Sequence, residues 1–312
     1  MKQLIFQNSV LFLWVSLMAS SFVMSQQLLP YASPLEGTAL RFILGSIFML
    51  PLVLYRWLFL NAKGLSLRVF IQYGFISLFL VLFFVGLFTA LQTTTALHTS
   101  VIYTLVPIVS VLFTFLGLKV ITARHQLFGF LLGIMGAIWV LLTLNSASSN
   151  LLINSSVTLN SLNQGDGIFL LACCSLSMHV TLVKKWGAQV PAALGAFYIM
   201  LCGSIILLPV VLWFSSFQGV AWQDVNFWKI LLYLTIFTTV GTFFLQQYLV
   251  KLVGPNKLMA FTYLIPFLVA LPQFYLLITK GHSFNLLLYS MPGIILTLLA
   301  LYLISKQQKA AI

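Results

Sequence analysis

Acidic side chains are nearly absent from this 312-residue sequence, which has three Asp and Glu residues against 15 Lys and Arg. Charged residues make up 6% of the chain, whereas a soluble domain carries roughly 25%. So few charges cannot solvate a globule of this size, and three acids exclude mechanisms that need a row of carboxylates inside a membrane.

A net charge of +12 would indicate nucleic-acid binding in a soluble protein. In a membrane protein basic residues collect in cytoplasmic loops, so we expect no nucleic-acid partner.

Cysteine is also scarce, and catalytic motifs are missing. Cys173, Cys174 and Cys202 lie within apolar runs, which excludes a disulfide framework and a metal-ligand spacing. The chain has no HExxH motif, no GxSxG motif and no acid pair within an apolar run. We therefore expect no metal, no cofactor and no enzyme activity.

Long apolar runs dominate what is present, since 61% of the residues are hydrophobic and the mean hydropathy is +1.10. A run of about 20 residues spans a bilayer as a helix, and an open sheet edge cannot be satisfied in lipid. The sequence predicts an all-α integral membrane protein with ten transmembrane helices. The expected spans are 9–28, 35–56, 69–91, 97–118, 126–144, 166–184, 191–214, 228–249, 258–278 and 286–305.

The first of these runs has an alternative interpretation. Lys2, an apolar stretch and Ala19-Ser20-Ser21 could form a cleaved signal peptide. Polar Gln7 and Asn8 precede a run longer than a signal core, however, and the repeat described below needs this helix. We therefore interpret it as the first transmembrane helix.

The basic residues predict the orientation of the chain. If the N-terminus is inside, the outer side holds only Lys229 and Lys280, and Arg41 lies within a span. The other twelve fall on the inner side: Lys2, Arg56, Lys63, Arg68, Lys119, Arg124, Lys184, Lys185, Lys251, Lys257, Lys306 and Lys309. Positive charge marks the cytoplasmic side. We expect a multi-pass protein of the cell membrane (the inner membrane in a bacterium) with both termini in the cytoplasm.

An uncharged Asn/Ser-rich linker at 145–164 divides the chain into 1–144 and 165–312, each with five predicted helices. The two halves share a repeated sequence. Gly45–Leu54 reads GSIFMLPLVL and Gly203–Leu212 reads GSIILLPVVL, which aligns the second span with the seventh.

A nearly equal offset aligns Leu105-Val106-Pro107 with Leu264-Ile265-Pro266, and so the fourth span with the ninth. Because each half has an odd number of helices, the second copy is inverted in the membrane. Inverted repeats are typical of alternating-access transporters, whose binding site lies between the halves near the midplane.

Several stretches carry a family resemblance. They read PYASPLEGTALRF (Pro30–Phe42), TALQTTTALHTSVIYTLVPIVSVL (Thr89–Leu112), GFLLGIMGAIWVLL (Gly129–Leu142), GDGIFLLACCSLS (Gly165–Ser177) and YLVKLVGPNKLMAFTYLIPFLVAL (Tyr248–Leu271). The chain resembles the EamA branch of the drug/metabolite transporter superfamily along most of its length. The resemblance implies two EamA-like repeats that rock about a central cavity. Helices one to four and six to nine would line this cavity, and helices five and ten would be peripheral.

The sequence departs from the family pattern in three places. Family members usually carry Gly-Glu after the fourth and ninth helices, where this chain has Gly117-Leu118-Lys119 and Thr279-Lys280-Gly281. Met18 aligns where many members have a tryptophan in the first helix. The resemblance therefore implies the fold but no particular substrate.

Arg41 is the most distinctive candidate for substrate binding, since it lies about two turns into the second span. An ionisable group at that depth costs roughly 2–3 kcal/mol even on insertion scales. A guanidinium can hold a carboxylate-bearing substrate through paired hydrogen bonds. The alternative is a structural arginine that either snorkels toward the membrane surface or pairs with Glu36 or Asp166. The resemblance favours that role, because arginine is common here among members with different substrates.

Histidines are the remaining candidates for proton coupling, because no carboxylate lies near the middle of a span. His179 is expected in the inner half of the sixth span, and His98 near the outer start of the fourth. Each could exchange a proton near neutral pH. A hydrogen-bonded histidine that only packs helices together is the alternative for both.

Other polar, proline and glycine residues are candidates through their positions. Five further polar residues lie on helices that the resemblance places around the cavity and could orient a solute there or bond helices together: Tyr103, Thr104, Tyr198, Gln246 and Tyr263. Four prolines occupy matched places in the repeats and could bend their helices, either to allow the two halves to rock or to shape a static cavity: Pro51, Pro107, Pro209 and Pro266.

A small-residue face is formed by Gly129, Gly133 and Gly136. It could serve close packing within the monomer or contact with a second copy in a homodimer.

These patterns together predict a transmembrane transporter of a small organic metabolite, such as an amino-acid-like or amphipathic solute, that works by alternating access. Export is expected because it is common in the family that the chain resembles. The alternative is a polytopic membrane receptor or assembly protein that transports nothing, for which an inverted repeat would have no mechanical purpose.

Overall fold

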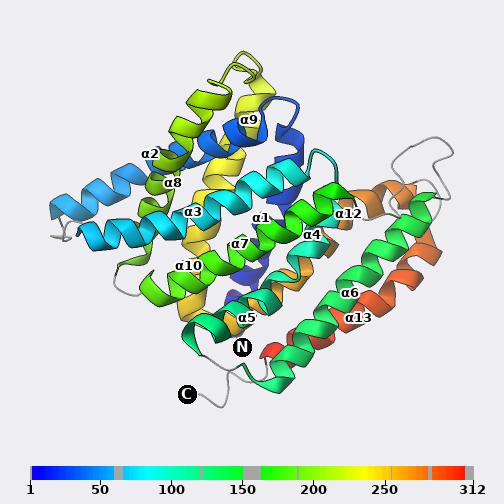
Figure 1. The fold of residues 1–312 in the computed structure, drawn as a ribbon. Coiled ribbons are helices and arrows are strands. Elements are labelled where there is room, and N and C mark those ends of the chain that lie inside the picture. The colour runs from blue at the N-terminus through cyan, green and yellow to red at the C-terminus, as the bar shows by residue number, and fades with distance from the viewer. Residues whose placement is uncertain are drawn as a thin grey trace.

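A computed structural model of the chain describes residues 2–59, 66–119, 122–149, 163–187, 190–253, 255–279 and 283–305. Within these residues every regular element is a helix (Figure 1). The first half contains α1 (Lys2–Leu28), α2 (Pro34–Phe59), α3 (Leu67–Ala90), α4 (Ala96–Tyr103), α5 (Val106–Leu118) and α6 (Arg124–Ser149). The second half begins with α7 (Gln164–Trp186), α8 (Ala192–Phe214), α9 (Val225–Thr235), a π-helix (Ile236–Gly241) and α10 (Thr242–Val253). It ends with α11 (Pro255–Phe261), a 3₁₀ turn (Thr262–Leu264), α12 (Ile265–Thr279) and α13 (Ser283–Ser305).

The predicted all-α membrane fold is confirmed. Among the described residues, nine helices are long and apolar enough to cross a membrane, and Leu288–Ile304 of α13 forms a shorter tenth apolar helix. The expected spans correspond to these ten in order. The α6 helix continues to Ser149, five residues into the predicted linker at 145–164. Most of the linker, from 150 to 162, lies outside the described residues, and so do Lys63, Lys280, Lys306 and Lys309.

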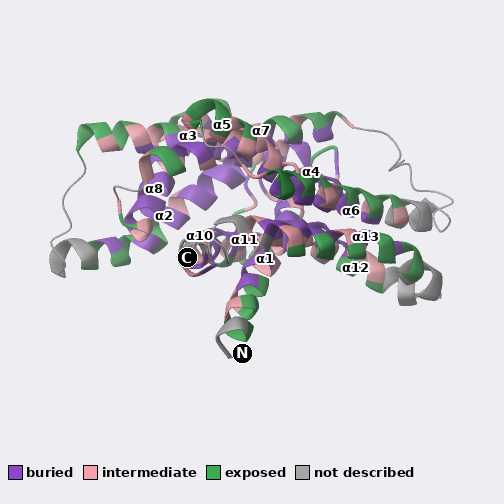
Figure 2. Cartoon of the chain, turned by 90° about the horizontal axis from the view of Figure 1, so that it is seen from below, coloured by how far each residue is buried: buried purple, intermediate pink, exposed green. Residues whose placement is uncertain are grey.

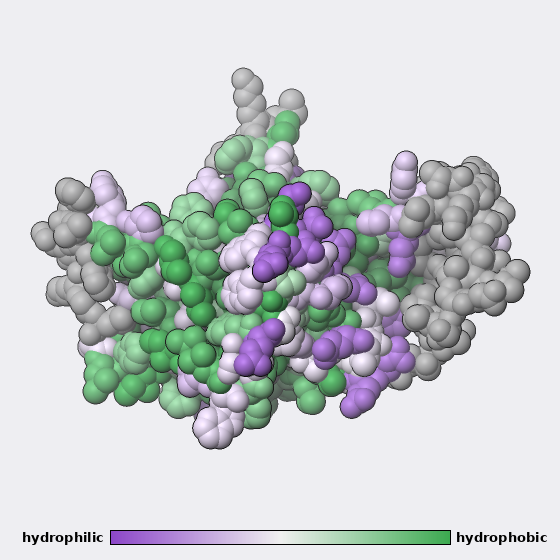
Figure 3. Space-filling model, turned by 90° about the horizontal axis from the view of Figure 1, so that it is seen from above, coloured by the Kyte–Doolittle hydropathy of each residue, from purple (hydrophilic) through white to green (hydrophobic). Residues whose placement is uncertain are grey.

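The outer surface is suited to lipid. Large apolar side chains such as Leu116, Leu171 and Trp213 are 65%, 71% and 84% exposed, which in water would be a liability. Figure 3 shows apolar residues covering much of one face, with hydrophilic residues gathered in a band near its centre. Buried residues concentrate toward the middle of the molecule (Figure 2).

The two halves pack through pairs of helices that each combine one helix from either half. The α3 helix lies against α7, α2 against α8, and α6 against α13, while α1 contacts α10 and α12. In Figure 1 the α6–α13 pair lies at one edge of the molecule. The fifth and tenth spans are therefore peripheral, and the remaining helices surround the centre.

Close packing within the monomer occupies the predicted glycine face of α6. A Cβ added at Gly129 would lie 2.7 Å from Ile304, and one at Gly133 would lie 2.5 Å from the ring of Tyr263. At Gly136 it would lie 2.7 Å from the carbonyl oxygen of Gly293. Of the two alternatives left open by the sequence, the structure shows intramolecular packing. A homodimer stays a prediction, but the glycine face no longer supports it, because contacts within the monomer occupy that face.

Two spans are interrupted at matching places in the two halves. The fourth span breaks at Thr104–Leu105 between α4 and α5, and the ninth breaks at the 3₁₀ turn between α11 and α12. Pro107 and Pro266 are each the second residue of the helix that follows, where a missing N–H costs least. Pro51 and Pro209 lie inside α2 and α8, which continue past them.

Candidate transport site

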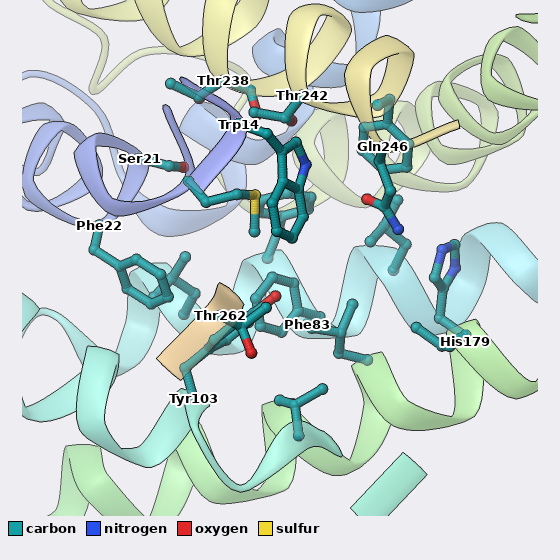
Figure 4. Close-up of a pocket in the computed structure, with 18 of the residues that line it drawn as sticks. Trp14, Ser21, Phe22, Phe83, Tyr103, His179, Thr238, Thr242, Gln246 and Thr262 are labelled. Atoms are coloured by element: carbon teal, nitrogen blue, oxygen red, sulfur yellow. The ribbon is translucent and has the colours of Figure 1, made fainter. Parts of the chain in front are cut away.

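An internal cavity of about 80 Å³ lies between the two halves (Figure 4). One buried water needs on the order of 15 Å³ by this measure, so the cavity has room for a handful of waters or a small solute group. Its walls come from α1, α2, α3, α4, α5, α7, the π-helix, α10, α11 and the 3₁₀ turn. The lining residues are Trp14, Met18, Ser21, Phe22, Arg41, Leu80, Phe83, Phe84, Leu87, Tyr103, Val106, Pro107, Leu176, His179, Val180, Thr238, Thr242, Phe243, Gln246, Leu258, Met259 and Thr262. Of the eight helices that the resemblance implied, only the seventh span contributes none of them.

Aromatic rings form much of the cavity wall. Phe22 meets Tyr103 edge to face with ring centroids 5.3 Å apart, and Phe83 meets Phe84 at 5.1 Å. Edge-to-face contacts of this kind add to the apolar packing and hold each ring in one orientation. The cavity is therefore mostly apolar, with a few polar side chains in fixed positions, as is typical of small-molecule sites.

Trp14 is a lining residue that the sequence did not reveal. The resemblance aligned Met18 where many family members have a tryptophan, but Trp14 lies one helical turn earlier and also lines the cavity. Figure 4 shows its indole projecting into the cavity. The side chain is 3% exposed, and its Nε1–H has no partner within the described residues. Residues 14 and 18 are four apart and so lie on the same face of a helix. This spacing was the signal in the sequence that could have identified Trp14 as a lining residue.

Arg41 contacts neutral groups rather than acids. Its Nε donates to the hydroxyl of Thr239, and its Nη2 donates to the Thr238 hydroxyl at 2.9 Å. Nη2 also lies 3.3 Å from the Ser21 hydroxyl and from the Thr238 carbonyl oxygen. The guanidinium carbon lies 4.3 Å from the centroid of the Phe84 ring, which fits a cation–π contact.

The π-helix Ile236–Gly241 places two of these partners. Thr238 and Thr239 are adjacent, yet both hydroxyls donate to the carbonyl oxygen of Leu234, at 2.8 Å each. The extra residue of a π turn lets neighbouring side chains face the same direction, and such turns are frequent at functional sites. Here it directs two hydroxyl oxygens at one guanidinium.

The structural pairing expected for Arg41 was wrong, because both candidate acids are used elsewhere. Glu36 forms a capping box with Ser33 at the start of α2: its Oε2 accepts the Ser33 N–H at 3.0 Å, and its own N–H lies 3.4 Å from the Ser33 hydroxyl. Asp166 caps α7 by accepting the Asn163 N–H at 3.0 Å. Each carboxylate therefore stabilises its own helix start.

Asp166 also holds the predicted candidate His98 away from the cavity. The Asp166 carboxylate accepts the Thr94 hydroxyl at 2.6 Å and lies 3.4 Å from Nδ1 of His98. All three side chains are buried. This cluster joins the starts of α4 and α7, and so connects the two halves at the end of the molecule that the sequence predicts to be external.

His179 and Gln246 line the opposite part of the cavity from Phe22, and in Figure 4 the Gln246 amide points toward the imidazole. Nδ1 of His179 lies 2.8 Å from the carbonyl oxygen of Ile76. A carbonyl oxygen can only accept, so Nδ1 carries the hydrogen in this contact. Nε2 is therefore the nitrogen that can accept a proton or a hydrogen bond.

The remaining predicted residues are not brought into the cavity. Thr104 donates to the Val101 carbonyl oxygen at 2.6 Å within the break between α4 and α5. Tyr198 stacks edge to face on Tyr73, with ring centroids 5.7 Å apart. Tyr263 packs on Gly133 of α6. The structure thus gathers Arg41, Tyr103, His179 and Gln246 at the cavity and leaves His98, Thr104, Tyr198 and Tyr263 outside its lining.

Two units of five membrane spans each surround a shared internal cavity, an arrangement typical of transporters that are built from internal repeats. The chain matches the EamA-like transporter family twice, over residues 7–142 and 163–306. It therefore belongs to this family, which confirms the resemblance and makes it a transporter of the drug/metabolite type. A search of curated proteins finds no match.

A solved structure described only as the crystal structure of a protein shows the same fold. The match covers 99% of this chain and 99% of that one, with a TM-score of 0.64 and 16% sequence identity. At this identity the likeness extends to the fold alone.

Proposed function

We propose that this protein exports a small amphipathic organic solute, such as an amino acid or a related metabolite, across the cell membrane by alternating access. The observation that carries the proposal is the internal cavity, because side chains of both EamA units line it. If the units rock against each other, the same side chains face one side of the membrane and then the other. The matched breaks in the fourth and ninth spans lie beside the cavity, at Pro107 and Thr262.

Solute flux in proteoliposomes tests this proposal. The purified protein should exchange radiolabelled metabolites from a broad panel in a counterflow assay, which needs no added driving force. Val180→Phe should reduce flux by at least tenfold, because Val180 lines the small cavity. Leu171→Phe is the matched control on the same helix, since Leu171 is 71% exposed on the lipid-facing surface.

Absence of flux across the panel would favour the alternative of a receptor or assembly protein. Chemical turnover of a panel member in detergent, where no second compartment exists, would instead indicate an enzyme. If Leu171→Phe and Val180→Phe reduce flux equally, a transport path through the cavity is contradicted.

His179 is the residue we expect to couple transport to a pH gradient, if the solute moves with or against protons. His179→Ala should abolish flux that is driven by an imposed pH gradient while preserving counterflow, because it removes the proton acceptor at the cavity. It also removes the hydrogen bond to the Ile76 carbonyl oxygen, so counterflow on the same preparation shows that the variant is still folded. His125→Ala is the control, since His125 is exposed at the start of α6. Unchanged gradient-driven flux in His179→Ala would eliminate this role.

A further inference from the structure

Arg41 is a cation enclosed by the protein without a counter-charge. Its side chain is 1% exposed. All three acids of the chain lie in the described residues, and none forms an ion pair with it there. Burying a charge costs several kcal/mol unless it is paired, and arginine keeps its charge in proteins. The structure therefore has a charge at its centre that the protein itself does not neutralise.

The groups around Arg41 position the guanidinium and leave part of it free. Hydroxyls of Ser21, Thr238 and Thr239 accept from Nε and Nη2, and Phe84 lies against the guanidinium plane. These partners are neutral, so they orient the guanidinium group without cancelling its charge. Nη1, which carries two N–H donors, has no partner among the described residues. The same side chain lines the cavity.

Two buried donors that line the cavity lack an acceptor among the described residues. The cavity's buried side-chain atoms without a partner in the described part of the chain are both donors, Nη1 of Arg41 and Nε1 of Trp14. A buried donor left unbonded costs about 1–3 kcal/mol. An anionic acceptor satisfies the arginine donor and neutralises its charge, and the aromatic wall of Phe22, Phe83 and Phe84 suits an organic group attached to it.

We propose that Arg41 is the anchor for a carboxylate group on the transported solute. The inference rests on the proposed transport function and narrows its substrate class to organic carboxylates, amino acids included. The π-helix holds the guanidinium through Thr238 and Thr239, and the solute supplies the counter-charge. A guanidinium is suited to this task because its planar donors match a carboxylate.

The experiment compares carboxylic acids with their own primary amides, which have nearly the same shape but lack the carboxylate charge. Short aliphatic acids, aromatic acids and α-amino acids are each paired with the amide and tested for thermal stabilisation of the detergent-purified protein. A ligand that binds only the folded state raises the melting temperature with its concentration. We expect at least one acid to bind ten times more tightly than its amide, and Arg41→Gln to remove this difference. Arg41→Lys, which keeps the charge but not the planar fork, should retain part of it.

The possible outcomes separate this inference from the proposed function. If no acid in the panel stabilises the wild-type protein more than its amide, or if the preference persists in Arg41→Gln, the carboxylate anchor is wrong. The acid–amide comparison in the wild-type protein decides this even if a variant fails to fold. Amides that cross proteoliposomes as fast as their acids overturn the anchor and leave transport standing. Acid-specific binding without any flux overturns transport and leaves the anchor standing.

Discussion

Arg41→Met should reduce carboxylate flux by at least tenfold while leaving the unfolding free energy within about 1 kcal/mol of the wild-type value, or raising it. Methionine fills similar space without a charge or unbonded donors. Thr238 and Thr239 keep their own hydroxyl hydrogens bonded to Leu234, so removal of the arginine leaves no donor of theirs unpaired. Loss of a charge-assisted hydrogen bond of about 1.5–3 kcal/mol corresponds to roughly 10- to 150-fold weaker binding. Thermal unfolding and counterflow on the same preparation measure the two effects.

Arg41→Ala is the matched control for this prediction. It removes the same charge but leaves a cavity, which typically costs about 2–5 kcal/mol for a large buried side chain. Both variants should lose flux, and only Arg41→Ala should lose stability. A structural arginine predicts that Arg41→Met also loses stability, because each hydrogen bond from the charged guanidinium to a hydroxyl contributes about 1.5–3 kcal/mol. A large loss of stability in Arg41→Met would therefore contradict the role of substrate anchor.

The fold could be predicted from the sequence because its determinants are local. Runs of about 20 apolar residues define transmembrane helices whatever their neighbours, and the repeated GSI and LPxVL segments preserve an internal duplication. Helix ends were less accurate, as for α6, because a helix can extend past its apolar run into polar residues. The two matches to the EamA-like family confirm this part of the prediction.

The surroundings of Arg41 could not be predicted in the same way, because they depend on contacts between distant segments. Ser21 lies 20 residues before Arg41, and Thr238 and Thr239 lie almost 200 residues after it. The sequence offered Glu36 and Asp166 as partners on the basis of charge alone. Nothing in the composition of Ile236–Gly241 marks it as a π-helix, because that geometry arises from the packing of the span.

The glycine face of α6 shows a related limit. Spacing identified Gly129, Gly133 and Gly136 as one face, but spacing does not tell which helix covers it. The structure answers this with α13 and Tyr263. A Cβ at Gly136 would lie 2.7 Å from the Gly293 carbonyl oxygen, and a Cβ at Gly293 would lie 2.9 Å from the carbonyl oxygen of Gly136. Backbone therefore meets backbone at this point, as in small-residue contacts between membrane helices.

Gly136→Ala should therefore lower the unfolding free energy by about 2–3 kcal/mol, the upper part of the range for overpacking. The contact involves backbone atoms, so no side-chain rotation relieves it, and α6 must move away from α13. Gly74→Ala is the matched control in α3, where an added Cβ has nothing within 4 Å. It should be neutral or slightly stabilising, because alanine favours a helix over glycine by about 0.5–1 kcal/mol. Thermal unfolding in detergent, with light scattering for the oligomeric state, measures both. If Gly136→Ala instead dissociates a dimer without changing the stability of the monomer, the glycine face belongs to an interface between two copies and the intramolecular role is wrong.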